Sequence, residues 1–487
     1  MADNKLTWLD ATATAEMVAS GEVKASEVTE AAIARIDSVN DQLNAVICPL
    51  YERARQRIET GLPDGPFTGV PIVAKDYDGA LGGAPYHCGM VALKEAGHVA
   101  PRSDINIARL EAAGFVVVGK TNTPELGLLP TTESEAYGSA RNPWDTSRST
   151  GGSSGGTAAA VASGMVPDST AGDGGGSIRI PASECGLVGL KPSRGRVPMG
   201  PDHSEEWGGL VVRGAETRTV RDAAAVLDVL GAPDHSGPYQ APPLRRPLID
   251  EVGAEPGRLR IRVLTAAPGD TTTTDPAIAE VVEAFGRLLE SQGHDVAEGS
   301  PTGIDDPELV GQFFPAFGSW TAAAVEEKGR WIGRPLTAHD VEPATWTLVE
   351  MGRATTAQQY LAAIDWMHGW AARMLSDWRR SPEGDDAGFD LLLTPTLPEV
   401  PPLLGQFQPQ PDNPLAGSMR AAALVPFMVP FNISGQPAIS LPAGSVQGLP
   451  VGAQLVAAPG REDLLVRVAA QIEAEHPWAG HQPGVHA

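Results

Sequence analysis

Cysteines and basic residues are scarce in this sequence, and each shortage excludes a class of protein. The three cysteines, Cys48, Cys88 and Cys185, cannot all pair and show no C-x-x-C spacing. We therefore expect neither a disulfide framework nor a structural zinc site. Lysine and arginine number 36 against 60 aspartates and glutamates, a formal net charge of −24. That charge argues against nucleic acid or an anionic membrane as a partner.

Long hydrophobic runs and metal-binding spacings are missing as well. The most apolar stretch, Ala421 to Phe431, contains two prolines and falls short of the ~18 residues that a membrane span requires. The first ten residues, MADNKLTWLD, lack a basic segment followed by an apolar one, so we expect no signal peptide and a cytoplasmic location. The ten histidines form no H-x-x-x-H or H-E-x-x-H group. We expect neither a metal nor an organic cofactor.

What the chain does contain is an alternation of helix and strand patterns, which predicts an α/β fold. The helical pattern is clearest at 275–293, where an aspartate cap, a proline, an apolar 3.6-residue period and a final glycine agree. Similar patterns predict helices at 12–20, 26–40 and 220–231. Six short apolar runs are typical of strands buried on both faces: 70–74, 115–118, 261–264, 391–393, 438–441 and 451–456.

Glycines concentrate in one region, where nine of the 55 lie between Gly151 and Gly176 among serines. Within it, GGSSG at 151–155 fits G-x-S-x-G, the nucleophile elbow of α/β-hydrolases, with Ser153 as the nucleophile. An esterase of that type also needs a histidine. His294 and His339 stay open as candidates, although neither follows a strand-end pattern. This interpretation remains a minor alternative.

A longer pattern joins two serine clusters. Ser153 and Ser177 lie 24 residues apart, each after glycines, and Lys75 ends an apolar run upstream. At these residues the chain resembles the amidase signature family. The resemblance extends over about residues 10 to 475 and is weakest at about 235–390. Eight blocks carry it: GVPIVAKD, GKTNTPELG, RNPWD, GLKPSRGRVP, TRTVRDAA, LLLTPTLP, PFNISGQPAISLP and GLPVGAQLV.

The resemblance implies a single α/β/α domain whose large mixed β-sheet is covered by helices on both faces. We expect residues 1–65 to form an N-terminal helical segment packed on the core, and residues 66–480 to form the amidase signature domain. Within that domain, about 235–390 would form a variable substrate-pocket region, and residues 481–487 would be a tail. It also implies an amidase, a hydrolase acting on carbon–nitrogen bonds other than peptide bonds.

The family's catalytic triad is Ser–cis-Ser–Lys, and the matching residues are Ser177 as nucleophile, Ser153 and Lys75. In the family, the peptide bond that matches Gly152–Ser153 is cis. The residues support a lysine base independently. Serine needs a base that removes its proton, and no histidine belongs to the glycine-rich blocks. A lysine accepts a proton only when it is neutral, a state that burial after an apolar strand favours.

Further roles follow from the same resemblance. The backbone amides expected to form the oxyanion hole are those of Gly174, Gly175, Gly176 and Ser177. Ser154 matches a serine that orients the lysine, and we give Asp173 and Arg179 supporting roles in fixing the serine loop. One departure stands out, because many members carry Gly-Thr-Asp-Thr-Gly-Gly-Ser where this chain has AGDGGGS at 171–177. The extra glycines could loosen the turn or make room beside the acyl group.

Loops, rather than the triad, determine the substrate. The segments 331–342 and 456–465, with Trp346, resemble the 6-aminohexanoate cyclic dimer hydrolases within the family. That likeness implies small, fairly apolar carboxamides of the nylon-oligomer type, with aryl acylamides and carbamates (urethanes) as neighbouring candidates. We expect the pocket to include Leu128, Leu129, Phe313, Phe317 and Trp320.

The expected partner is therefore a small-molecule amide or carbamate, and a homodimer is left open. A glutamine-hydrolysing subunit of a tRNA amidotransferase uses the same triad and is the main alternative. The strong acidity of the chain counts modestly against that alternative.

Overall fold

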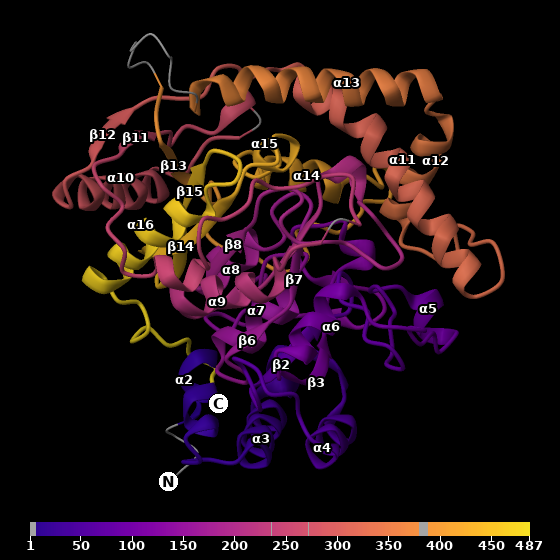
Figure 1. Ribbon diagram of the computed structural model, residues 1–487. Coiled ribbons are helices and arrows are strands. Elements are labelled where there is room, and N and C mark those ends of the chain that lie inside the picture. Colours follow the sequence, from indigo (N-terminus) through magenta and orange to yellow (C-terminus); the bar gives the residue numbers. More distant parts are fainter. Residues whose placement is uncertain (1–5, 235, 271, 379–387) are drawn as a thin grey trace.

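The computed structural model describes residues 6–234, 236–270, 272–378 and 388–487. Its centre is one mixed sheet of eleven strands in the order β1-β3-β2-β6-β10-β8-β14-β15-β13-β11-β12 (Figure 1). Their bounds in that order are Val46–Pro49, Val116–Thr121, Pro71–Lys75, Asp168–Ser169, Glu216–Thr217, Val188–Lys191, Ala438–Val446, Leu449–Ala457, Leu391–Pro395, Arg260–Val263 and Asp295–Glu298. β2 runs parallel to β3 and β6, and β11 runs parallel to β12 and β13, whereas the pairs between these groups are antiparallel. The predicted large mixed sheet is confirmed.

The helices of the described residues are α2 (Ala11–Ala19), α3 (Ala25–Leu43), α4 (Tyr51–Thr60), α5 (Val91–Glu95), α6 (Ile105–Ala112), α7 (Gly155–Ala162), α8 (Arg179–Cys185), α9 (Val220–Leu230), α10 (Pro276–Ser291), α11 (Glu308–Trp331), α12 (Pro343–Ala354), α13 (Ala357–Met374), α14 (Ala416–Leu424), α15 (Val429–Ile433) and α16 (Glu462–Glu475). The four helices and six strands predicted from the sequence are all present. Their bounds differ from the predictions by a few residues, because helix and strand ends are weakly specified by pattern. α10 shows why its pattern was clear, since the Asp275 carboxylate accepts the amide of Ala277 at 2.9 Å and caps the helix.

Alternate side chains of the strands pack on opposite faces of the sheet. Ile72 and Ala74 of β2 join the core formed with α6, α9, α10 and α16. Val73, between them, faces the other way and packs with α3, α7 and α8. Leu392 of β13 lies on that second face too, against α13 and α15. Helices therefore cover both faces, as the α/β/α prediction requires.

The C-terminal residues lie beside the start of the described chain, near α2 in Figure 1. The His486 ring lies 5.9 Å from the Trp8 ring, and the amide of Ala487 donates to the carbonyl of Ser163 at 3.0 Å. The N-terminal segment also supplies β1, an edge strand antiparallel to β3. Far from these ends, α11 packs against both α12 and α13 (orange in Figure 1).

Two observations bear on location. No helix in the described part of the chain is both long and apolar enough to cross a membrane. Half of the decapeptide on which the signal-peptide prediction depends lies outside the described residues, which begin at residue 6.

Candidate active site

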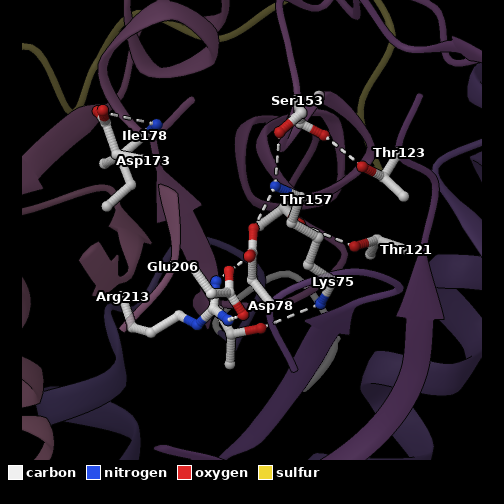
Figure 2. Close-up of polar contacts among 12 residues, drawn as sticks. Lys75, Asp78, Thr121, Thr123, Ser153, Thr157, Asp173, Ile178, Glu206 and Arg213 are labelled. Carbon is white, nitrogen blue, oxygen red and sulfur yellow. Dashed lines mark hydrogen bonds and ion pairs between the residues drawn. The ribbon is translucent and has the colours of Figure 1, made fainter. Parts of the chain in front are cut away.

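Strand alternation brings Lys75 to the first serine. Lys75 follows Val73 by two residues on β2, so its side chain lies on the same face of the sheet as α7. Ser153 stands just before α7, and the Nζ of Lys75 lies 2.7 Å from its Oγ (Figure 2). Thr123 holds the backbone there by donating its hydroxyl to the carbonyl of Ser153 at 2.9 Å. The Gly152–Ser153 peptide bond is cis.

The surroundings of Lys75 favour its neutral form. The side chain is fully buried, and burial lowers the pKa of Lys75 to about 7, helped by the nearby Arg213 guanidinium. The carboxyl groups of Glu216, Asp173 and Glu206 act in the opposite direction without cancelling that effect. A substantial fraction of the amine is therefore neutral, and able to accept a proton, near neutral pH.

Asp78, which the sequence analysis did not select, makes the second contact of the lysine. The Nζ of Lys75 donates to Asp78 Oδ2 at 2.7 Å. The other carboxylate oxygen of Asp78 pairs with Arg213, which in turn donates to Glu206 Oε1 at 2.8 Å (Figure 2). The only signal for Asp78 was a second aspartate in the KDYD run, and Arg213 is 135 residues away in sequence from Asp78.

Ser154 is placed differently from the expectation. Its hydroxyl is buried and has no hydrogen-bond partner among the described residues, so it does not hold Lys75 by a hydrogen bond. The carboxylate of Asp78 accepts the hydrogen bond from Lys75 instead.

Ser177 stands before α8 and opens into the same cavity as Ser153. Gly174 and Gly175 line this cavity too. Gly176 differs from the expectation, because its amide donates to Asp173 Oδ1 at 2.8 Å and the residue does not line the cavity. That amide points toward the buried carboxylate of Asp173 and therefore not toward a substrate in the cavity.

Asp173 and Arg179 clamp the glycine loop onto the rest of the domain. Both side chains are fully buried, and the guanidinium donates to both carboxylate oxygens, at 2.9 and 3.0 Å. Arg179 also donates to Gln454 of β15 and to Asn432 of α15, each at 2.7 Å. Burial alone would raise the pKa of Asp173, but Arg179 outweighs it and holds that pKa below its usual range. The pair therefore ties the glycine loop to β15 and α15 through charge-assisted hydrogen bonds.

A cavity of about 190 Å³ lies over the two serines. Of the expected pocket residues, Leu128, Leu129, Phe313 and Phe317 line it. Trp320 does not, because its ring stacks behind Trp207, with 6.1 Å between the ring centroids. Trp207 itself lines the cavity, as do Tyr77 and Val211 and several residues of α14 and of the loop that follows it: Ser418, Ala421, Ala422, Val425 and Pro426.

The surroundings of Gly174, one of the extra glycines, leave little room for a side chain. A Cβ atom at this position would lie 3.1 Å from the Trp207 ring and 3.0 Å from Val211. Without a side chain at Gly174, these two residues approach the glycine loop and form a wall of the cavity.

Charged groups are few around the cavity. Within the described part of the chain its lining contains two carboxylates, Asp78 and Asp306, and no lysine, arginine or histidine. His294 bonds instead to Gln471 and to the amide of Leu259. Among the described residues, no histidine lines the cavity beside Ser153, which counts against the nucleophile-elbow alternative. The described residues also contain no group of three or more histidine, cysteine, aspartate or glutamate side chains arranged to hold a metal ion.

The clamp leads to a stability prediction. Asp173→Ala leaves the buried Arg179 guanidinium without its carboxylate, which should lower the free energy of unfolding by about 3–5 kcal/mol. Urea unfolding followed by circular dichroism measures this. The control is Asp145→Ala, which removes the partially exposed partner of Arg148 and should cost less than about 1 kcal/mol. Equal losses in the two variants would contradict the clamp.

Comparison with known proteins covers nearly the whole chain. The amidase family model matches residues 27–466. A 6-aminohexanoate-cyclic-dimer hydrolase of Paenarthrobacter ureafaciens is 42% identical over 484 residues, which are 98% of this chain and 96% of that protein. The solved structure of 6-aminohexanoate cyclic dimer hydrolase complexed with substrate has a TM-score of 0.93 at 40% identity, covering 99% of this chain and 100% of that one.

A more distant structure agrees. A bacterial aryl acylamidase of the amidase signature enzymes has a TM-score of 0.84 at 27% identity, covering 97% of this chain and 99% of that one. The family model spans most of the sequence, and the first of these relatives shares well over a third of its residues along the full length. The chain therefore belongs to the amidase signature family and is a hydrolase acting on carbon–nitrogen bonds other than peptide bonds.

Proposed function

We propose that the protein cleaves small, apolar carboxamides and carbamates through an acyl-enzyme on Ser177, with Ser153 and Lys75 as the proton relay. The observation that carries the proposal is the 2.7 Å contact between the fully buried Nζ of Lys75 and the Oγ of Ser153, in a cavity that Ser177 shares. The names of the two relatives with cyclic-dimer activity support amides of the 6-aminohexanoate type.

In the acylation step, Ser177 Oγ attacks the substrate carbonyl carbon and passes its proton to Ser153. Ser153 passes its own proton to the neutral amine of Lys75. The negative oxygen of the tetrahedral intermediate accepts hydrogen bonds from the amides of Gly174, Gly175 and Ser177, and one such donor lowers the barrier by about 3 kcal/mol.

The intermediate then expels the amine, which takes the proton back from Ser153 as Lys75 returns its own. Water attacks the acyl-Ser177 ester by the same relay and releases the acid. A urethane has the same attackable carbonyl, so it follows the same steps. These steps use only the hydroxyl protons of Ser177 and Ser153 and the amine of Lys75, and no cofactor takes part in them.

The lining of the cavity supports an apolar substrate. Leucine, phenylalanine and tryptophan side chains surround the serines, which suits an aminohexanoyl chain or an aryl group. Glutamine carries an α-carboxylate, and within the described residues no lysine or arginine lines the cavity to pair with it. We therefore prefer the small-amide hydrolase to the glutamine-hydrolysing amidotransferase subunit.

The nucleophile is tested by mass spectrometry of the intact protein during turnover of an aryl carbamate. We expect an acyl adduct on the Ser177 peptide and none in Ser177→Ala, which should stay folded because Ser177 lines the cavity and is only partly buried. Product release is followed in parallel, since rapid deacylation hides an adduct. An adduct on Ser153 would contradict the assignment.

The substrate class is tested by measuring kcat/KM for 6-aminohexanoate cyclic dimer, a nitroanilide, an aryl carbamate and glutamine. At least one of the three apolar substrates should exceed glutamine by about 100-fold or more, because no lysine or arginine among the described residues lines the cavity to pair with the α-carboxylate of glutamine. Preferential release of ammonia from glutamine would favour the amidotransferase subunit instead.

The lysine base predicts a pH dependence. Lys75 accepts a proton only when neutral and its pKa is about 7, so kcat/KM should rise with pH through a midpoint near 7 and level off above it. Lys75→Ala should lose this limb together with nearly all turnover. Substantial activity in that variant would exclude a lysine base.

A further inference from the structure

Asp78 lies between two basic side chains, Lys75 and Arg213, in the interior of the protein. Its side chain is buried, with one carboxylate oxygen on Lys75 and the other on Arg213 (Figure 2). Arg213 is buried too and donates a hydrogen bond to Glu206. A continuous chain of hydrogen bonds and ion pairs therefore runs from Ser153 through Lys75 and Asp78 to Arg213.

Gly172 provides the space for that carboxylate. A Cβ atom at this position would lie 2.4 Å from Asp78 Oδ2 and 2.5 Å from its Cγ, which is closer than atoms can approach. β7 (Ala171–Asp173) pairs with β9 (Val212–Gly214), and this register sets Gly172 opposite Arg213. Gly172 has no positive φ, so its backbone would accept an alanine, and the obstacle is Asp78.

This position is also where the chain departs from the family pattern, which has a threonine there in many members. A threonine would bring the Cβ that collides with Asp78. The Asp78 carboxylate can therefore occupy its position because residue 172 has no side chain.

We propose that Asp78 is a positioning residue that holds the Nζ of Lys75 against Ser153, and that Gly172 is the residue that makes room for it. The inference rests on the proposed function, in which Lys75 is the base.

The need for such a residue follows from the chemistry of the amine. Lysine carries its nitrogen on a flexible four-carbon stem, and a neutral amine has two N–H bonds and one lone pair. When Asp78 accepts one N–H, the lone pair turns toward the hydroxyl proton of Ser153. A carboxylate that is itself held by Arg213 has little freedom to move, so it fixes the direction of that lone pair.

The charges around Lys75 set the sign of the expected pH effect. They come from the loop after β2 and from β7, β9, β10 and the segment before Trp207: Asp78, Asp173, Arg213, Glu216 and Glu206. Asp78 stabilises the ammonium form by direct contact. Its removal leaves the repulsive Arg213 near the amine, so the base should then deprotonate at lower pH.

The first test compares Asp78→Ala and Asp78→Asn with the wild type. We expect Asp78→Ala to lower kcat/KM by about 100-fold, because the amine loses its orientation. Asp78→Asn keeps an oxygen that can accept the N–H and should lose less. In both, the acid limb of the pH profile should move to lower pH by about one unit or more. An unmoved limb would overturn the inference, because a merely structural role does not alter the base.

The second test uses Gly172, because Gly172→Ala displaces the Asp78 carboxylate without removing it from the protein. Gly172→Ala should push the carboxylate away and reproduce the loss seen in Asp78→Ala. Once Asp78 is alanine, the two closest contacts are gone and only the Cβ of residue 78 remains, 3.0 Å away, so adding Gly172→Ala should cost less than about threefold more. Independent, multiplying losses in the double variant would contradict the coupling.

Gly286→Ala on α10 is the matched control, since a Cβ there meets only ordinary contacts of 3.5 Å or more and should leave kcat/KM unchanged. Lys75→Ala distinguishes failure of the positioning role from failure of the proposed function. If Lys75→Ala is inactive but Asp78→Ala retains wild-type kcat/KM and pH limb, the positioning role fails and the proposed function stands. If Lys75→Ala is active, the proposed function itself fails.

Discussion

The burial of Lys75 is the constraint on which the site depends. An ammonium group without a partner in the interior costs several kcal/mol, so the surrounding structure must either neutralise this lysine or pair it. Both solutions are present, since burial brings the pKa of Lys75 to about 7 and Asp78 lies in direct contact. The same burial allows a lysine to act as a base at neutral pH, which a solvated lysine cannot do.

Each secondary-structure element around Lys75 meets part of that constraint. β2 directs the side chain of Lys75 to the face of the sheet that α7 covers, where Ser153 lies. The pairing of β7 with β9 sets Gly172 and Arg213 side by side, so that space and counter-charge for Asp78 come from one small sheet. A second buried ion pair, Asp173 with Arg179, holds the glycine loop beside them. Stability and chemistry are linked here because both depend on compensated buried charge.

Much of this could be predicted from the sequence, since local patterns determine it. The apolar runs identified strands such as β2 and β13, and the glycine–serine spacing identified the family and the residues that meet around the cavity. Contacts between distant segments that the resemblance does not name were not predictable. Asp78 and Arg213 are 135 residues apart in sequence, and Trp207 approaches the glycine loop at Gly174, where a side chain would crowd its ring. Gly176 shows a further limit, because the direction of one amide depends on the buried Asp173 carboxylate that captures it.

The central claim, that a substantial fraction of Lys75 is the neutral amine near neutral pH, can be measured directly. The sequence contains seven lysines, so ¹⁵N NMR of the side-chain nitrogens gives few signals, and Lys75→Met identifies the one from Lys75. The account predicts that this signal titrates with a midpoint near pH 7. A Lys75 signal that remains that of an ammonium group above pH 9 would contradict the account, because no base would then be available to Ser153.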